Sequence, residues 1–308
     1  MKRLLFTGGG GAVYEALCRL WQSRYDMHFV DANPDAFSPD LPRERCHVGP
    51  LGSDPGFAAA TAALCKKLNV DLLVPAVDEE LRHAARVGEI APGLAIMLPG
   101  TDYVVTMLDK LKMAESLRGK RLPVPRTVTF ERIAEIGFPC FAKPRHGRGS
   151  RGVQILRDAA AAAAYRTLSG LADDQIVVQD LLEGQEYTVM MAADREARLH
   201  AVVPVKVLLK RGITLRAETE ANAAVIDVCA AIHRALPTTG CYNIQLCLTS
   251  NQSVLPFEIN PRISTTFCLG AAAGVDPVNI FLRNEPPRGL CEFRAGVKLQ
   301  RSWHNHIS

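Results

Sequence analysis

The chain has 308 residues, of which 48% are hydrophobic and 22% are charged, and 36 basic against 32 acidic residues give a formal net charge of +4. This composition is typical of a globular protein and excludes a disordered chain. The charge excess is too small to indicate nucleic-acid binding by itself, and at roughly 100–200 residues per domain the length predicts two domains or three small ones.

The first hundred residues alternate between apolar strands and helical patterns. Strands are expected at residues 2–7, 27–30, 45–48, 70–76 and 94–98. Helices are expected after Gly8–Gly11, with Val13 and Leu17 on one face, and at residues 57–68. Because strands alternate with helices, this part of the chain predicts a parallel, doubly wound α/β sheet.

The rest of the chain has a different pattern. One helix is expected at residues 102–118, and it cannot continue through the Leu122-Pro123-Val124-Pro125 segment. Strands are expected at residues 138–143, 153–156, 176–179, 187–192, 199–205, 242–249 and 254–259. Helices are expected at residues 158–169 and around Val225–Leu236. Strands gathered around few helices predict an α+β unit.

Cysteine usage and the absence of a leader indicate the compartment. No two of the nine cysteines are spaced as C-x-x-C, and most lie in apolar stretches, so reduced and buried thiols in a cytoplasmic protein are expected. The apolar run after Met1-Lys2-Arg3 is too short for a signal peptide, and no stretch is long enough for a membrane span.

Gly8–Gly11 follow the first strand and open a helix. Gly8 and Gly10 match the first two glycines of a dinucleotide-binding fingerprint and Asp31 is suitably placed, but Val13 stands where the third glycine belongs. One interpretation is a phosphate or carboxylate site at a helix N-terminus. The favoured interpretation is a tight turn in a nucleotide-fold domain that binds no dinucleotide.

A second glycine-rich loop lies between two strands. Lys143 ends an apolar strand, and the loop that follows carries three glycines, Gly147, Gly149 and Gly152, together with three arginines. Backbone amides beside glycine and the arginine charges favour a lid over nucleotide phosphates. The alternative is a solvated basic hairpin.

Two later segments carry polar side chains that suit a nucleotide and a metal. In residues 179–187, Glu186 is placed to bind a ribose and the backbone of Asp180–Leu182 to read an adenine edge, although an ordinary loop would look the same. Glu258 and Asn260 lie on one face of a strand, and Gln245 joins them if the two strands pair. Three oxygen ligands suit Mg²⁺, and Arg262 is placed for a phosphate; the alternative is an exposed edge strand.

Two acidic or histidine-containing motifs remain ambiguous. Asp78-Glu79-Glu80 either bind an amino group at the carboxyl end of the sheet or cap the helix that starts at Leu81. His304-Asn305-His306 spell a nuclease-like motif, but without a supporting ββα pattern they are interpreted as a tail.

Taken in order, these elements resemble the ATP-grasp superfamily, closest to the carbamoyl-phosphate-synthetase-like branch that includes stand-alone carboxylate–amine ligases. The matching motifs are Asp109-Lys110, Phe141-Ala142-Lys143-Pro144 with its loop, Glu183-Gly184-Gln185-Glu186, Asn243-Ile244-Gln245 and Glu258-Ile259-Asn260-Pro261-Arg262. The resemblance implies a nucleotide-fold domain at residues 1–100 and two α+β subdomains, at 101–180 and 181–308, that grip ATP. Gln245 departs from the acidic residue of many relatives, which leaves the number of metal ions open.

The resemblance also implies roles for individual residues. Lys110 and Lys143 contact the ATP phosphates, and Arg262 and Lys143 act in catalysis. The loop residues that close over the phosphates are Gly147, Arg148, Gly149, Ser150 and Gly152. Gln179, Asp180 and Leu182 lie beside the adenine, Glu186 binds the ribose, and the metal ligands are Gln245, Glu258 and Asn260. Expected substrate contacts are Gly9, Gly10, Asp78, Glu79, Lys206, Arg211, Arg262 and Ser264, of which Lys206 and Arg211 belong to the basic segment 206–216.

The resemblance implies an ADP-forming ligase that joins a carboxylate to an amine through an acyl phosphate. Its cofactors would be ATP and Mg²⁺, with Mn²⁺ as an alternative. Its partners would be small molecules, with no nucleic acid and no membrane, and a homodimer stays open. The rival functions are carboxyphosphate or carbamoyl-phosphate synthesis, an NAD-binding oxidoreductase built on Gly8–Gly11, and a nucleotide-sensing regulator without chemistry.

Overall fold

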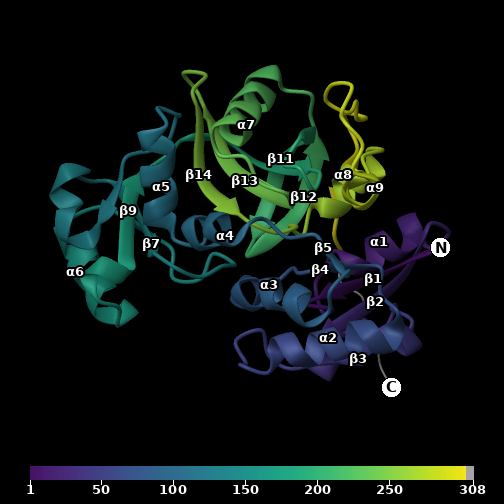
Figure 1. The fold of residues 1–308 in the computed structure, drawn as a ribbon. Coiled ribbons are helices and arrows are strands. Elements are labelled where there is room, and N and C mark those ends of the chain that lie inside the picture. The colour runs from purple at the N-terminus through teal and green to yellow at the C-terminus, as the bar shows by residue number, and fades with distance from the viewer. Residues whose placement is uncertain (303–308) are drawn as a thin grey trace.

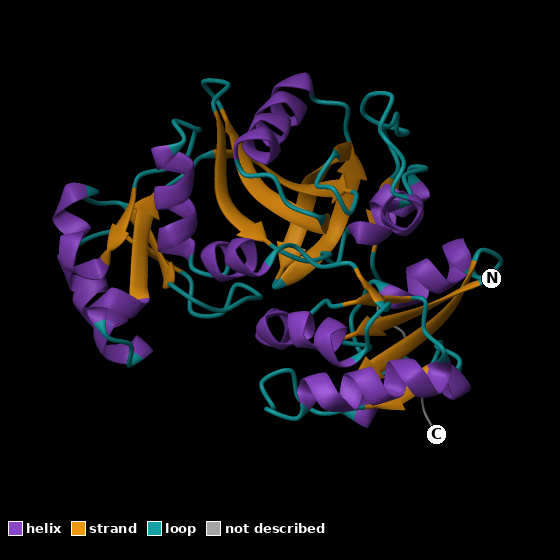
Figure 2. Ribbon diagram, in the orientation of Figure 1, coloured by secondary structure: helices purple, strands orange, loops and turns teal. Residues whose placement is uncertain are grey.

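The computed structural model describes residues 1–302, which fold around three β-sheets (Figure 1). The N-terminal sheet has five strands, a small sheet has four, and a large sheet has six. Figure 2 shows helices packed beside each of them. The His304-Asn305-His306 motif lies outside the described residues.

The N-terminal sheet is entirely parallel, with the strand order β3-β2-β1-β4-β5. Its strands are β1 (Lys2–Thr7), β2 (Tyr25–Asp31), β3 (Cys46–Val48), β4 (Leu72–Val74) and β5 (Ala95–Ile96). The helices around it are α1 (Tyr14–Trp21), α2 (Phe57–Leu68) and α3 (Leu81–Ile90). The prediction of a parallel α/β sheet is therefore confirmed, with strand ends that differ by a few residues.

The single helix expected at residues 102–118 is wrong, because the structure has two. Helix α4 (Thr101–Met107) ends just before Asp109, and α5 (Lys110–Gly119) begins just after it. The Asp109 carboxylate accepts hydrogen bonds from the amides of Leu111 (3.1 Å) and Lys112 (3.2 Å), so Asp109 caps the second helix. This break places Lys110 in the first turn of α5.

The small sheet is antiparallel, with the order β6-β9-β7-β8. Its strands are β6 (Thr127–Thr129), β9 (Ile176–Asp180), β7 (Cys140–Pro144) and β8 (Gln154–Leu156). Helix α6 (Ala159–Ser169) packs on it, and the unit has its own apolar core around Phe130 and Val178. Strand β6 was not expected, since three residues after a proline segment give too short a pattern.

The large sheet is also antiparallel, with the order β14-β13-β10-β11-β12-β15. Its strands are β10 (Gly184–Ala193), β11 (Leu199–Arg211), β12 (Ile213–Thr219), β13 (Gly240–Thr249), β14 (Val254–Asn260) and β15 (Lys298–Gln300). Helix α7 (Ala223–Ala235) buries Val225, Cys229 and Ile232 against one face. Helices α8 (Phe267–Ala272) and α9 (Pro277–Arg283) follow β14. Strands β12 and β15 were not expected, because charged residues interrupt their apolar pattern.

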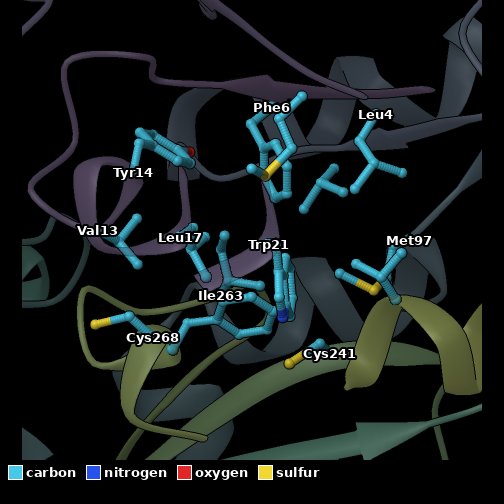
Figure 3. Packing of buried hydrophobic residues seen from close by; sticks show 14 of the residues in the cluster. Leu4, Phe6, Val13, Tyr14, Leu17, Trp21, Met97, Cys241, Ile263 and Cys268 are labelled. Atoms are coloured by element: carbon cyan, nitrogen blue, oxygen red, sulfur yellow. The ribbon is translucent and has the colours of Figure 1, made fainter. Parts of the chain in front are cut away.

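The N-terminal unit and the large sheet share one apolar core (Figure 3). Trp21 of α1 meets Phe267 of α8 edge to face, with ring centroids 5.8 Å apart. Ile263 and Cys241 belong to the same cluster. Tyr25 also donates a hydrogen bond to Asp276, at 2.8 Å. These contacts fix the loops at the carboxyl end of the parallel sheet against one face of the large sheet.

The cysteines agree with the expectation of free thiols. All nine are unpaired, and six of them are buried. Among residues 1–302, none of the helices is long and apolar enough to span a membrane. The division at residues 100 and 180 stays a proposal.

Candidate active site

A cavity of about 600 Å³ lies between the small sheet and the large sheet, and we name it the first cavity. Ten of the predicted nucleotide-binding residues line it: Lys110, Lys143, Gly147, Arg148, Gly149, Ser150, Gln179, Asp180, Leu182 and Glu186. Gly152 is not among its lining residues. The fold thus brings together residues that are up to 76 positions apart, such as Lys110 and Glu186.

Two polar side chains of β9, Gln179 and Asp180, line one end of the first cavity. Gln179 is buried and donates a hydrogen bond to the Thr127 hydroxyl at 2.7 Å. The Asp180 carboxylate accepts from the Arg126 amide and guanidinium, each at 2.8 Å. Apolar Phe141, Ile155 and Leu182 also line the cavity, which gives it walls that suit a flat ring.

The two predicted phosphate lysines differ in their surroundings. Lys143 is 3% exposed, donates to the Phe257 carbonyl at 3.1 Å and lies 5.5 Å from the centre of the Phe257 ring. Burial lowers the pKa of Lys143 to about 8, and nearby Glu258 opposes that shift. Lys110 donates to the Gly147 carbonyl at 2.7 Å, so it contacts the glycine loop directly.

The glycine loop is anchored at its start and crosses to the N-terminal unit. Arg145 binds the Asp109 carboxylate with two hydrogen bonds, at 2.8 and 2.9 Å, and is mostly buried. Arg148 pairs with Glu79 at 3.0 Å, and both side chains are partly exposed. Gly147 and Gly149 have positive φ angles of 108° and 71°. Arg145 is therefore a fixed residue, and the part of the loop that we expect a nucleotide to reorder begins after it.

This anchoring sharpens the prediction of a lid. We expect trypsin to cleave the free protein after Arg148 and Arg151 but not after Arg145. A non-hydrolysable ATP analogue with Mg²⁺, at a hundred times its Kd, should slow these cuts by about 100-fold, since a ligand bound only to the closed form reduces the open population. Mass spectrometry of timed digests measures this, with NAD as the control, and equal rates with and without the analogue contradict a lid.

The predicted metal residues lie on one face of the β13–β14 pair. Gln245 is opposite Glu258, and Asn243 is opposite Asn260. Gln245 and Glu258 line the first cavity. Asn260 is buried, donates to Asn243 at 3.2 Å and accepts from Arg262 at 3.4 Å. Glu258 is thus an accessible carboxylate with a neutral amide beside it, while Asn260 contacts Arg262.

Asp78 and Arg262 form an ion pair that the sequence did not indicate. Their carboxylate and guanidinium are hydrogen-bonded, and both side chains are largely buried, at 13% and 14% exposed. Asp78 belongs to the short 3₁₀ helix η3 (Asp78–Glu80) of the N-terminal unit.

The Glu80 side chain accepts hydrogen bonds from Thr7 and from two amides at residues 76 and 77, and it caps no helix amide of α3. Three consecutive acids therefore have separate partners.

A second cavity of about 400 Å³ lies between the N-terminal loops and the large sheet. It shares six lining residues with the first cavity: Arg148, Gly149, Glu186, Lys210, Gly212 and Gln245. Of the predicted substrate residues, Gly10, Arg262 and Ser264 line it. The structure does not bring the full predicted set together, because five of its members are not among the lining residues: Gly9, Asp78, Glu79, Lys206 and Arg211.

The basic segment faces the cavities through a different residue from those expected. Lys206 is paired with Tyr187, whose ring packs against α7, so Lys206 lies on the α7 face of the large sheet, away from the cavities. There it contacts Glu220 at 3.6 Å. Arg211 is exposed at a hairpin end. Lys210 lines both cavities and donates to Glu186 at 2.5 Å. The register shift between Val207 and Leu209 adds one residue to β11 and moves Lys210 onto the face of the cavities.

The amides of the Gly8–Gly11 turn are used inside the protein. Gly9 donates to the Val30 carbonyl (3.0 Å), Gly10 to the Asp31 carboxylate (3.0 Å) and Gly11 to the Gly8 carbonyl (2.8 Å). A Cβ atom on Gly9 would lie 2.5 Å from Phe37. The glycines are thus explained by close packing, which favours the turn over a dinucleotide site.

Comparison with known proteins finds a family and two relatives. The model of the ATP-grasp domain family matches residues 107–266. The carbamoyl phosphate synthase large chain of Clostridium acetobutylicum is 22% identical over 97% of this chain, which spans 30% of that relative's length. An uncharacterized protein of Sinorhizobium fredii is 27% identical over 58% of this chain and 41% of its own length.

Solved structures share the fold. The biotin carboxylase domain of Hydrogenobacter thermophilus 2-oxoglutarate carboxylase, bound to MgADP and bicarbonate, superposes with a TM-score of 0.71 at 15% identity, over 93% of this chain and 71% of that one. N5-carboxyaminoimidazole ribonucleotide synthetase from Thermotoga maritima gives 0.67 at 18% identity, over 95% and 78% of the two chains.

Proposed function

Because the chain belongs to the ATP-grasp family, we propose that it is an ADP-forming ligase that joins a carboxylate to an amine. The observation that carries this proposal is the junction of the two cavities at Arg148, Lys210 and Gln245. A nucleotide in the first cavity directs its phosphates toward this junction, and a carboxylate in the second cavity meets them there. A cytoplasmic location and small-molecule substrates are part of the proposal.

The proposed reaction has two steps. A carboxylate oxygen attacks the γ-phosphorus of ATP, the bond to the β-phosphate oxygen breaks, and ADP leaves. The amine nitrogen then attacks the carbon of the acyl phosphate, phosphate leaves, and the nitrogen loses a proton to give the amide. The protein positions the reactants and neutralises charge, which is the main contribution of enzymes to phosphoryl transfer.

Five cationic side chains of this chain would serve those steps. Lys143 and Lys110 line the nucleotide cavity, while Lys210 and Arg148 lie where the cavities meet. Arg262 lines the second cavity with its guanidinium held by Asp78, so its orientation is fixed before substrate binds. A positioned guanidinium stabilises the charge that develops on the transferred phosphoryl group.

The residues on the β13–β14 pair fit a magnesium ion. Glu258 offers a carboxylate and Gln245 an amide oxygen on one face of the first cavity. Among residues 1–302 no three His, Cys, Asp or Glu side chains gather to hold a metal, so nucleotide phosphates and water would complete the shell. Asn260 stays a predicted third ligand to this ion. When bound, Mg²⁺, or Mn²⁺ in its place, would neutralise phosphate charge.

Bicarbonate is the second candidate for the carboxylate. The match to a carbamoyl phosphate synthase over 97% of this chain favours it, since carboxyphosphate is the acyl phosphate of bicarbonate. The same residues would serve that reaction.

The test is a screen for ADP release. Purified protein with MgATP is incubated with panels of carboxylates, bicarbonate included, and of amines, and mass spectrometry identifies the products. We expect ADP release that requires a carboxylate, and a rise of the melting temperature with MgATP but not with NAD. Stabilisation by NAD alone contradicts the nucleotide site, and ATP binding without any carboxylate-dependent ADP release supports the regulator instead.

A further inference from the structure

The second cavity has an unequal distribution of charge among its lining residues. Five charged side chains line it: Arg148, Lys210, Arg262, Glu186 and Asp31. The first four are neutralised within the protein. Arg148 pairs with Glu79, Lys210 pairs with Glu186, and Arg262 pairs with Asp78.

Asp31 is different because it has no cationic partner among the described residues. It follows the last apolar residues of β2, and its two oxygens accept hydrogen bonds from the amides of Gly10 and Asn33, each at 3.0 Å. Within residues 1–302, no nitrogen of Lys, Arg or His lies within 4.0 Å of its carboxylate. These amides fix the orientation of the carboxylate and leave its charge uncompensated.

The rest of the cavity lining near the large sheet is neutral and rich in hydroxyl groups. Thr188, Thr214, Ser264, Thr265 and Thr266 all line it. A ligand that fills the cavity excludes water from Asp31. Excluding water from a charged carboxylate is unfavourable unless a cation or strong hydrogen-bond donor replaces the water. An anionic ligand group is repelled from this wall.

We propose that Asp31 binds an ammonium group that the amine substrate carries in addition to its reacting nitrogen. The inference rests on the proposed function, because it places the substrate in the second cavity, with the uncharged reacting nitrogen beside the phosphate on the Arg262 side and the second, unreacting ammonium on the Asp31 side. Asp31 acts here as a binding residue, and a charge-assisted hydrogen bond to it supplies selectivity for amines over alcohols. A ligand that binds through hydroxyl groups is the competing outcome.

The test compares two probes that differ only in one ammonium group, 4-aminobutan-1-ol and butane-1,4-diol. Each is titrated against the full chain with MgADP, and saturation-transfer NMR gives the half-saturating concentration. We expect the amine to saturate the protein at a concentration about tenfold or more below that of the diol. Asp31→Asn should abolish the difference. Asp35→Asn is the matched control, since it removes the same charge from an exposed residue that does not line the cavity.

Three outcomes overturn the proposal. The first is equal affinity of the wild-type protein for both probes, and the second is a lack of saturation by the amine. Both are measured on the wild-type protein, so the test remains decisive even if the Asp31→Asn variant fails to fold. An Asp31→Asn variant that keeps the preference also overturns it. The readout does not use turnover. Amine binding that depends on Asp31, with no ADP release in the substrate screen, would count against the ligase function alone.

Discussion

Arg262→Ala is expected to lower the rate of ADP formation by about 10²–10³-fold, because it removes a positioned cation from the transferred phosphoryl group. No metal concentration should restore the rate, since in the proposed site Arg262 acts on the phosphoryl group and is not a metal ligand. Steady-state ADP release against Mg²⁺ concentration measures this.

The ion pair with Asp78 adds an effect on folding. Removing Arg262 leaves the Asp78 carboxylate buried at 13% exposure without its partner. Breaking a buried pair in this way lowers the free energy of unfolding by about 3–5 kcal/mol. The double variant Arg262→Ala, Asp78→Ala removes both charges and should regain most of that stability. If the double variant also regains the rate, the arginine has only a structural role.

Glu258→Ala is expected to abolish most ADP formation at low Mg²⁺ and to be partly rescued by high Mg²⁺ or Mn²⁺. Glu258 carries the formal negative charge of the proposed metal face, since Gln245 and Asn260 are neutral. At limiting Mg²⁺ we expect a loss of about 10²-fold, comparable to the loss of one stabilising group in the transition state. Near-normal turnover of this variant at low Mg²⁺ would show that the strand pair is structural.

The same variant makes a prediction about pH. Burial lowers the pKa of Lys143 to about 8, and the Glu258 carboxylate opposes that shift. Without Glu258 the pKa of Lys143 falls further, so its cationic form is lost at lower pH. The alkaline limb of the rate–pH profile, measured at the high Mg²⁺ that restores turnover, should therefore move to lower pH in Glu258→Ala. Glu258→Gln is the matched control and should move it similarly, because it also removes the charge.

Local patterns were enough to predict the parallel N-terminal sheet and most of the first cavity. Lys143 ends an apolar strand and the glycine loop follows it, so sequence neighbours carry that part of the site. Glu258 and Asn260 are two residues apart on one strand, which also gives a local signal.

Features that depend on distant contacts gave no such signal. Asp78 and Arg262 are 184 residues apart, and their acidic and basic neighbours look like ordinary surface charge. Lys210 reaches the cavities because the register shift between Val207 and Leu209 breaks the alternation of β11, and strict alternation would place it on the face of Lys206. The break between α4 and α5 was missed because Leu108 and Asp109 fit a continuous helical pattern until the Asp109 cap is seen.

The apolar core shared by α1 and α8 determines which parts of the molecule can separate. Trp21 and Phe267 belong to one cluster, whereas the small sheet has a core of its own around Phe130 and Val178. Pulling the N-terminal unit from the large sheet would expose that cluster to water, which opposes such a motion. Turning the small sheet would leave that cluster buried. We therefore expect the N-terminal unit and the large sheet to move as one body and the small sheet as another. The width of the first cavity can then change, while the walls that the N-terminal unit and the large sheet give to the second cavity keep their spacing; its Arg148 and Gly149 belong to the small-sheet loop and move with it.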